Sequence, residues 1–418
     1  MKTSYQKVVL ISTVWPESTS SAAGVRDEQL LQAFTQAGKK CYCLSPSQEN
    51  SFSEKIKKLG IEVKTILLND PSFDQLIKEI NPDVVIFDRF LMEEQFGWRV
   101  KQNCPQAMRI IDTQDIHFLR KARQRALSQG VELSKIFNAD LDFYNDGDCL
   151  RELASILRSD VSFVLSDFEK NLLITRFNVP ASKLYLLRFF YDMEIPPSMD
   201  FKKRRNFVFI GNFRHPPNLD CIQWMKKEIW KPIQKKLPGV QFHVYGAYPS
   251  AEVSKMHDPT NGWIMKGGAK DAISTLLGYR YLLAPLRFGA GIKGKITDSW
   301  IAGTPVITTP IGSEGMHDSL PFGGQIVQSS TECIKVAIEE YENKNSWINF
   351  SKLGSEIVSA LYCNPQTIKN LIQFIQNTFE NRIEAQKNDW LSQMLWHESM
   401  KSTEYFSRWI EAKNKNKL

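Results

Sequence analysis

The chain has 418 residues, of which 42% are hydrophobic and 24% are charged. This composition excludes a disordered or fibrous chain, and the length fits two domains of about 200 residues each better than a single core. The formal net charge of +7 is compatible with phosphate-bearing ligands, an anionic membrane, nucleic acid or simply a lysine-rich surface, and it does not choose among them.

Short Val/Ile-rich runs alternate with amphipathic segments through the first half of the chain. Strands are predicted at residues 8–11, 40–44, 62–67, 83–87, 108–112, 161–165 and 184–187, and helices between them include 23–37 and a long polar region at 117–157. This alternation predicts a parallel sheet with helices on both faces. We therefore assign residues 1–195 to a Rossmann-like, doubly wound α/β domain.

Prolines and a basic run interrupt this pattern at 194–205, which predicts a linker. The pattern then resumes with strands at 206–210, 240–244, 263–265, 281–284, 305–308 and 324–327. Residues 205–375 are therefore expected to form a second Rossmann-like domain.

The sequence becomes helical from about residue 329, and we expect residues 376–418 to form a helical tail that packs back on the first domain. Trp390, Trp396 and Trp409 are its predicted packing anchors, because aromatic side chains dominate burial. Disorder is expected only at the extreme end, 413–418.

The most informative segment, residues 284–306, reads APLRFGAGIKGKITDSWIAGTPV. It predicts a strand, a glycine-rich loop, a helix and a second strand. Glycines let a backbone approach a ligand closely, and the helix N-terminus offers free N–H groups to an anion. The residues expected to hold a diphosphate and the ribose beside it are Gly289, Gly291, Lys293, Gly294, Lys295 and Asp298.

Together with FIGNFRHPPNLD at 209–220 and TPIGSEG at 309–315, this segment resembles the donor domain of GT-B glycosyltransferases of family four. The resemblance is strong over residues 204–330 and weak over the first domain. That family carries a Glu-x7-Glu element before Ala-x-Ala-x-Gly-x-Pro-Val. Asp298 stands at the second Glu position and Ala290 at the first, within a Gly-Ile-Lys-Gly-Lys form that also occurs in a branch of the superfamily.

The resemblance implies two Rossmann-like domains that face each other across a cleft and transfer a sugar from a nucleotide-diphosphate donor. It favours retention of configuration. Because the family's first Glu contacts the donor sugar, Ala290 leaves the identity of the sugar and the stereochemical outcome open.

Further site residues follow from the same resemblance. Arg214, in the loop after the first strand of the second domain, is implied to meet the donor phosphate, with a surface arginine as the alternative. Residues 245–246 and 263–267 are implied to recognise the base. In the first domain, Gly24 lies in a loop that resembles the glycine-rich acceptor-side loop and is implied to approach the donor. Arg26 is either a phosphate ligand or a residue on a helix surface.

Residues 112–120 follow a strand at the cleft edge, where many GT-B enzymes carry a Thr-x-His-Asp or Asp-x-His type element. Gln114 takes the usual His place, and Asp115 and His117 lie close by. Either is a candidate general base in an inverting reaction, whereas in a retaining reaction it only positions the sugar. Alternatively, Asp112 caps a helix and His117 is a buried, hydrogen-bonded histidine.

Two more clusters lie in the first domain. Residues 88–97 also follow a strand and are a candidate acceptor site, although the adjacent Glu93 and Glu94 diverge on a helix and form no acid/base pair. Ser166 and Glu169 resemble a Ser-x-x-Glu element of the superfamily. The preferred interpretation is a helix N-cap with a capping-box glutamate.

Seven cysteines, an odd number without a CxxC pair or a Cys/His cluster, indicate a reduced, cytoplasmic interior. The first apolar run is too short for a signal peptide, and no stretch approaches the ~18 apolar residues of a spanning helix. We therefore expect no transmembrane segment, and any membrane contact to be peripheral, at the cytoplasmic face.

These patterns predict a metal-independent glycosyltransferase with no cofactor besides its nucleotide-sugar co-substrate. The acceptor is unidentified and ranges over a glycan, a lipid-linked sugar, a protein or RNA. The alternatives are a catalytically degenerate nucleotide-sugar-binding protein and a sugar-nucleotide epimerase, which needs Asp, Glu and His around the sugar. A nucleic-acid-binding protein is a third, suggested by the basic run 202–205, which is short and lacks interleaved aromatics.

Overall fold

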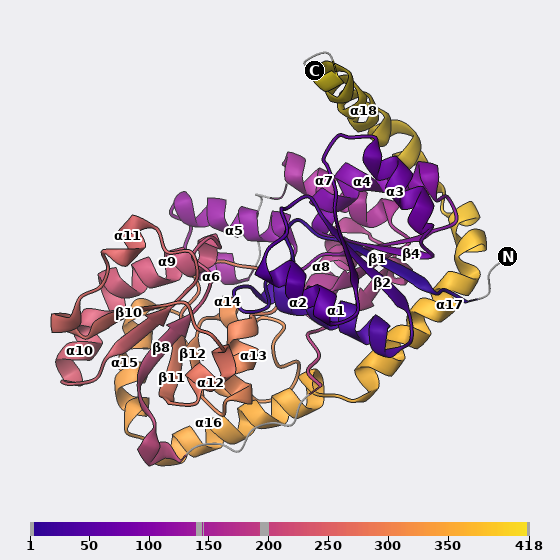
Figure 1. Cartoon of the computed structure of the whole chain (residues 1–418). Coiled ribbons are helices and arrows are strands. Elements are labelled where there is room, and N and C mark those ends of the chain that lie inside the picture. Colours follow the sequence, from indigo (N-terminus) through magenta and orange to yellow (C-terminus); the bar gives the residue numbers. More distant parts are fainter. Residues whose placement is uncertain (1–3, 139–143, 145, 193–199, 416–418) are drawn as a thin grey trace.

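The computed structural model of the chain describes residues 4–138, 144, 146–192 and 200–415, without the side chains of residues 398–401. Two α/β domains lie side by side, and the C-terminal helices run along both (Figure 1). The predicted linker at 194–205 lies partly outside the described residues. Of the end predicted to be disordered, 413–418, residues 413–415 belong to a helix and 416–418 lie outside the described residues.

The first domain is built on a sheet of seven parallel strands in the order β3-β2-β1-β4-β5-β6-β7. The strands are β1 (Lys7–Ile11), β2 (Lys40–Ser45), β3 (Glu62–Thr65), β4 (Val84–Asp88), β5 (Met108–Asp112), β6 (Val161–Val164) and β7 (Leu184–Leu186). The helices are α1 (Ala22–Gln36), α2 (Ser51–Lys58), α3 (Ser72–Ile80), α4 (Arg89–Asn103), α5 (His117–Ser128), α6 (Leu133–Phe137), α7 (Gly147–Arg158) and α8 (Asp167–Phe177). The predicted helical region at 117–157 is thus divided among α5, α6 and α7.

The second domain has six parallel strands in the order β10-β9-β8-β11-β12-β13. They are β8 (Arg205–Ile210), β9 (Phe242–Tyr245), β10 (Trp263–Gly267), β11 (Tyr279–Ala284), β12 (Val306–Thr308) and β13 (Gly324–Ile326). Its helices are α9 (Pro216–Trp224), the π-helical turn η4 (Met225–Ile229), α10 (Trp230–Lys236), α11 (Ala251–Ser254), α12 (Ala272–Leu276), α13 (Gly294–Ile301), α14 (Pro310–Ser313), α15 (Ser330–Tyr341) and α16 (Lys344–Ile357).

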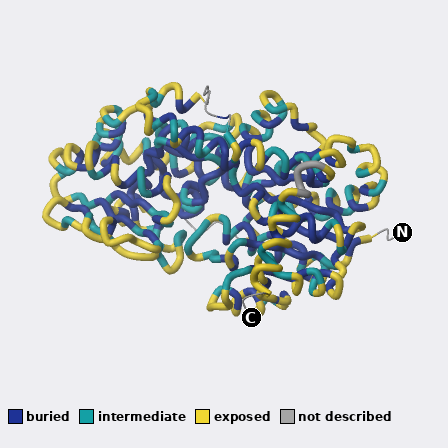
Figure 2. Tube along the Cα trace, turned by 90° about the horizontal axis from the view of Figure 1, so that it is seen from above, coloured by how far each residue is buried: buried dark blue, intermediate teal, exposed yellow. Residues whose placement is uncertain are grey.

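The strand order reverses once in each sheet, between β1 and β4 in the first domain and between β8 and β11 in the second. Ligands of such open α/β sheets bind outside the carboxyl ends of the strands at these switch points. Buried residues lie in the interior of both domains and also where the two domains meet (Figure 2). The predicted architecture, two doubly wound α/β domains with a helical C-terminal region, is confirmed.

Helix α17 (Gln366–Asn388) leaves the second domain and packs on the first, where Leu371, Ile375 and Phe379 join the core cluster beneath the first sheet. Helix α18 (Trp390–Lys415) then lies against α4 and α7. Trp396 is buried against Trp98, which confirms it as an anchor. Trp390 and Trp409 are 71% and 56% exposed, so the prediction was wrong for these two: their positions fall on the outer face of the helix.

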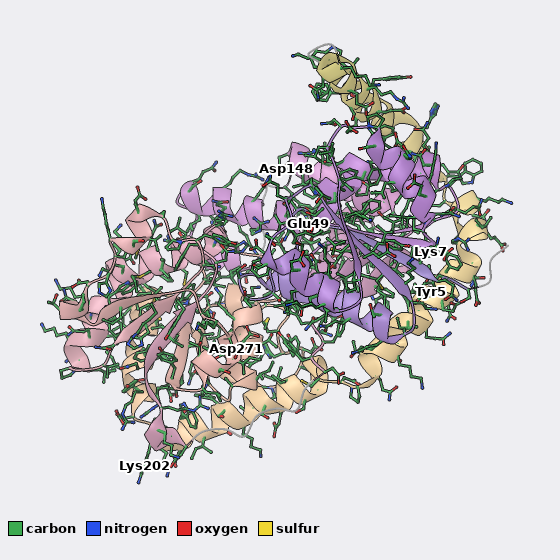
Figure 3. All side chains as sticks on the ribbon, viewed as in Figure 1. Tyr5, Lys7, Glu49, Asp148, Lys202 and Asp271 are labelled. Atoms are coloured by element: carbon green, nitrogen blue, oxygen red, sulfur yellow. The ribbon has the colours of Figure 1, made fainter. Side chains whose placement is uncertain are left out.

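The basic run at 202–205 does not form a free cationic stripe. Lys202 lies at the outer tip of the second domain (Figure 3). Arg204 is fully buried and donates to the hydroxyl of Thr304 and to the carbonyl of Ala302, and Arg205 donates to backbone carbonyls of the run itself. Because these guanidinium groups bind the protein, the run gives no support to a nucleic-acid site.

All seven cysteines are free, six of them buried. Within the part of the chain that the structure describes, no group of three or more His, Cys, Asp or Glu side chains could hold a metal ion, and no helix has the length and apolar character needed to cross a membrane.

Candidate active site

A cavity of about 520 Å³ lies between the two domains. From the first domain it is lined by residues of the loop after β1 and the start of α1, by Arg89 after β4, and by Gln114 and Asp115 after β5. The loops after β8, β9 and β11 line it from the second domain. Both switch points therefore open into one cleft, where a ligand of two Rossmann-like domains is expected.

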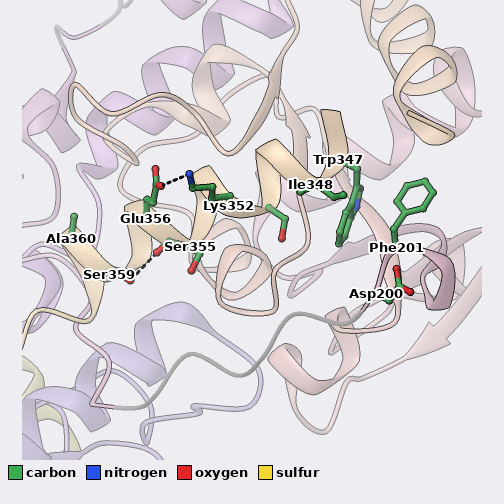
Figure 4. Close-up of a pocket in the computed structure, with 10 residues that line it drawn as sticks. Asp200, Phe201, Trp347, Ile348, Lys352, Ser355, Glu356, Ser359 and Ala360 are labelled. Atoms are coloured by element: carbon green, nitrogen blue, oxygen red, sulfur yellow. Dashed lines mark hydrogen bonds and ion pairs between the residues drawn. The ribbon is translucent and has the colours of Figure 1, made fainter. Parts of the chain in front are cut away.

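A second hollow, of about 870 Å³, lies along α16 and Phe201, away from the strand ends (Figure 4). Two of its serines already donate to backbone carbonyls: Ser351 to Gly303 over 2.8 Å and Ser359 to Ser355 over 2.9 Å. Lys352 faces Glu356 at 3.7 Å. Since these polar groups already have partners within the protein and no strand end of the described chain reaches this hollow, the interdomain cleft is the better candidate site.

The glycine-rich segment forms the floor of the cleft on the side of the second domain. It leaves β11, turns through Gly291 at φ 65°, and enters α13 with Lys293 at the N-cap. A Cβ at Gly291 would lie 2.9 Å from the Cβ of Asp115 and 3.0 Å from the carbonyl oxygen of Gln114. Both the left-handed backbone and the contact with the first domain therefore require glycine here. Gly291 itself faces the first domain and does not line the cavity, whereas Gly294 does.

Two lysines stand at this helix terminus and line the cleft. The ammonium group of Lys293 donates to the carbonyl of Gly291 over 2.7 Å. Lys295 donates to the side chain of Asn218, and its Nζ lies 4.3 Å from the ring centre of Phe209. Burial lowers the pKa of both lysines to about 8. They are thus mostly cationic at pH 7, and an anion beside them would stabilise that charge further.

Asp298 also lines the cleft, and the hydroxyl of Tyr191 donates to its carboxylate over 3.3 Å. Burial raises the pKa of Asp298 to about 7. Arg214 lies exposed at the cleft rim, with its guanidinium group 3.9 Å from the ring centre of Tyr248. The structure therefore brings Arg214, Lys293, Lys295 and Asp298 together around one cavity.

On the opposite wall, Asp115 lines the cleft, whereas His117 is buried behind it. The Asp115 carboxylate lies 3.1 Å from Nε2 of His117 and accepts from Nε of Arg120 over 2.6 Å. Burial raises the pKa of Asp115, but Arg120 and His117 outweigh it and hold the pKa well below its usual value. An always-ionised carboxylate with these partners is a weak proton acceptor but a good hydrogen-bond acceptor for a sugar hydroxyl.

Residues 204–338 match the sequence model of the family described as glycosyl transferases group 1. The chain is a glycosyltransferase of the GT-B fold. No curated protein matches its sequence.

Solved structures share the fold of this glycosyltransferase at low identity. Sucrose-phosphate synthase from Thermosynechococcus elongatus superposes with a TM-score of 0.61 at 14% identity, covering 90% of this chain and 99% of that one. A mutant of S. aureus TarM, in complex with fondaparinux, alpha-GlcNAc-glycerol and UDP, gives 0.64 at 10% identity, again over 90% and 99%. Anabaena HepE, in complex with UDP-glucose, gives 0.59 at 13% identity, over 90% and 100%.

The loop before α1 of this glycosyltransferase differs from the sequence-based expectation. Gly24 does not line the cleft: its N–H donates to Ser21, and a Cβ there would lie 2.4 Å from the backbone nitrogen of Glu17. Arg26 is fully buried and pairs with Asp112 at 2.7 Å, so both interpretations of Arg26 were wrong. Asp112 ends β5 and caps no helix.

The cluster at 88–97 is not an acceptor site as a whole, because its two glutamates bind within the protein. Glu93 is buried against Arg158 at 2.5 Å, and Glu94 pairs with Arg151 at 2.6 Å. Arg89 does line the cleft, with a backbone φ of 67° that is rare for a side chain of this kind. Its position directly after a predicted strand was the signal that could have singled it out.

Ser166 caps α8 as predicted, accepting from the N–H of Glu169 over 3.2 Å. The Glu169 carboxylate does not complete a capping box and instead accepts from Ile116 and Gly291. Tyr191, which lines the cleft, was missed because its loop carries no motif.

Proposed function

We propose that the protein transfers a sugar from a nucleotide-diphosphate donor to an acceptor hydroxyl, with the diphosphate held at the start of α13. The observation that carries this proposal is the convergence of the helix N-terminus, Lys293 and Lys295 on one interdomain cavity. Backbone N–H groups and cationic side chains at a helix N-terminus are an anion site. UDP in the TarM complex and UDP-glucose in the HepE complex make uridine donors the first to test.

The charge that develops on the leaving diphosphate is stabilised by the two lysines and by the α13 dipole. We propose that this makes transfer independent of a metal ion. Asp298 then accepts from the ribose hydroxyls, with Tyr191 fixing its carboxylate. Arg214, at the rim, contacts the outer phosphate or the sugar.

The stereochemical proposal is retention. The lowered pKa of Asp115 suits a residue that orients the donor sugar and suits a general base poorly. His117 supports Asp115 from behind and does not reach the cavity. The resemblance to family four also favours retention, and membership of that family is part of this proposal.

A nucleotide-sugar-binding protein without transferase activity is the second candidate. Ala290 favours it, since family four carries a glutamate at that position. Donor hydrolysis or transfer would exclude it. The match to the glycosyl transferases group 1 model argues against the epimerase alternative.

The test is a screen of UDP-, GDP-, ADP- and dTDP-sugars for thermal stabilisation and hydrolysis in the presence of a chelator. The wild type is compared with Lys295→Ala, and Lys202→Ala serves as control because it removes an exposed lysine far from the cleft. We expect one donor to stabilise the wild type and the control, and Lys295→Ala to bind it about ten- to a hundredfold more weakly, since a hydrogen bond to a charged group contributes ~1.5–3 kcal/mol. Equal donor binding by Lys295→Ala and the wild type would reject this phosphate site.

We further propose a cytoplasmic location with peripheral membrane contact through α18, and a lipid-linked sugar as the first acceptor to test among glycans, proteins and RNA. The outer face of α18 exposes large apolar side chains: Trp390, Leu391, Met394, Tyr405, Phe406 and Trp409. The acidic Glu404 and Glu411 on this helix pair with Arg408 and Arg99.

The last turn of α18 carries two lysines, Lys413 and Lys415. Aromatic side chains beside lysines are typical of interfacial helices that bind anionic lipid. Flotation with anionic vesicles should recover the wild type but not a Trp390→Ser/Trp409→Ser variant. Equal recovery of both proteins would refute membrane contact through this face.

A further inference from the structure

Arg123 of α5, in the first domain, directly contacts the backbone of the glycine-rich segment. This guanidinium group is fully buried and donates to the carbonyl of Gly289 over 2.8 Å. It also binds both carboxylate oxygens of Glu314, over 2.9 and 2.6 Å. Arg123 belongs to the first domain, whereas Gly289 and Glu314 belong to the second, so one side chain binds two segments of the facing domain.

A second first-domain side chain holds the same segment two residues later. One carboxylate oxygen of Glu169 accepts from the N–H of Gly291 over 2.8 Å and from the N–H of Ile116 over 2.9 Å. Ile116 directly follows Asp115 in the cleft wall of the first domain. The same oxygen thus links the wall that carries Asp115 to the segment that carries the two lysines.

Between Gly289 and Gly291 the segment also packs tightly against the first domain. Gly291 has no room for a Cβ against Asp115, and Ala290 packs against an apolar cluster of the first domain that includes Ile116. Segment 289–291 is therefore held by two polar contacts and by close packing, all provided by the first domain.

We infer that Arg123 and Glu169 are positioning residues: from the first domain they set the backbone of segment 289–291, and so the diphosphate site at α13 is complete only when the two domains are closed on each other. The inference deepens the proposed function and rests on it for the identity of the ligand. The geometry of the segment itself does not depend on the ligand.

A buried carboxylate without contact to the facing domain provides a matched control. Glu152 is fully buried and accepts from two backbone N–H groups, those of His117 and Phe118, over 3.0 and 2.9 Å. Its donors all belong to the first domain. Glu169→Leu and Glu152→Leu therefore remove the same chemistry, but only Glu169→Leu releases the donor segment.

The experiment compares both variants with the wild type by amide hydrogen exchange over residues 286–295 and by donor affinity. We expect Glu169→Leu to raise exchange of this segment, and the Kd and KM for the donor, by about tenfold or more, the effect of one lost buried hydrogen bond. The KM for the acceptor should stay within about twofold. Glu169→Gln, whose amide oxygen still accepts, should restore donor affinity to within about threefold of the wild type.

The inference is overturned if Glu169→Leu exchanges this segment at the wild-type rate, or if Glu152→Leu loosens it equally. Arg123→Met, which removes the contact to Gly289, gives the same comparison should Glu169→Leu fail to fold. The exchange measurement needs no ligand. A wild type that binds no nucleotide sugar would therefore reject the proposed function, while the exchange result would still decide whether the first domain positions this segment.

Discussion

Replacing Gly291 by alanine separates the backbone requirement at this position from the contact between domains. The left-handed φ of 65° costs a non-glycine residue about 1–2 kcal/mol. The new Cβ would also lie 2.9 Å from the Cβ of Asp115, closer than carbon atoms pack. Either the segment shifts or the domains separate slightly, and both displace the lysines from the proposed diphosphate site.

Gly38 gives the matched control. It has a φ of 73°, and a Cβ there meets nothing within 4 Å, so Gly38→Ala carries only the backbone cost. In both variants, each kcal/mol of lost stability should lower Tm by about 2–4 °C, the scale for domains of this size. Only Gly291→Ala should also weaken donor binding, by about five- to thirtyfold, as a shift of ~1–2 kcal/mol implies.

Isothermal titration with the donor found in the screen, together with thermal denaturation, measures both quantities. Equal donor affinity in Gly291→Ala and Gly38→Ala would refute the argument that the contact with Asp115 sets the site. A loss of affinity in both would mean that general destabilisation, and not this contact, controls binding.

Three further predictions follow from single side chains. Because burial raises the pKa of Asp298 to about 7 in the folded protein, the folded state binds more protons than the unfolded state between about pH 4 and 7. The free energy of unfolding should therefore fall as pH rises through that window. Urea titrations should show a shallower fall in Asp298→Asn than in the wild type, with the remaining slope coming from Glu152 and Glu169, whose pKa values burial also raises. Asp115→Asn should lower kcat at least about tenfold, with no change of the pH profile between pH 6 and 8, since the pKa of Asp115 lies far below that range. Trp396→Ala should cost about 3–5 kcal/mol of stability, whereas Trp409→Ala should stay within about 0.5 kcal/mol, and denaturant unfolding distinguishes the two.

The strands of both domains were predictable because a strand of a parallel sheet is buried on both faces and leaves a continuous apolar run in the sequence. The local structure of segment 284–306 was predictable for a similar reason, since closely spaced glycines after a strand indicate a loop and the residues that follow favour a helix. In the structure, Lys293, Lys295 and Asp298 indeed share one cavity.

Contacts between the domains left no local signal. Glu169 stands three residues after Ser166, as a capping-box residue does. This spacing does not predict that its carboxylate binds Gly291, more than a hundred residues later. Arg26 of α1 gave the same difficulty, because its partner Asp112 lies at the end of β5, 86 residues later. Trp390 and Trp396 are both aromatic residues of one helix, and only the packing of that helix decides which of them is buried.

The chemistry of the cysteines has a practical consequence. Burial raises the pKa of thiols such as Cys43 and Cys221, so their reactive thiolate is scarce at neutral pH. A cysteine introduced at the exposed Glu49 of the first domain and another at the exposed Lys202 of the second should therefore react first with maleimide dyes (Figure 3). Opening and closing of this enzyme can thus be followed by single-molecule fluorescence without removing a native thiol.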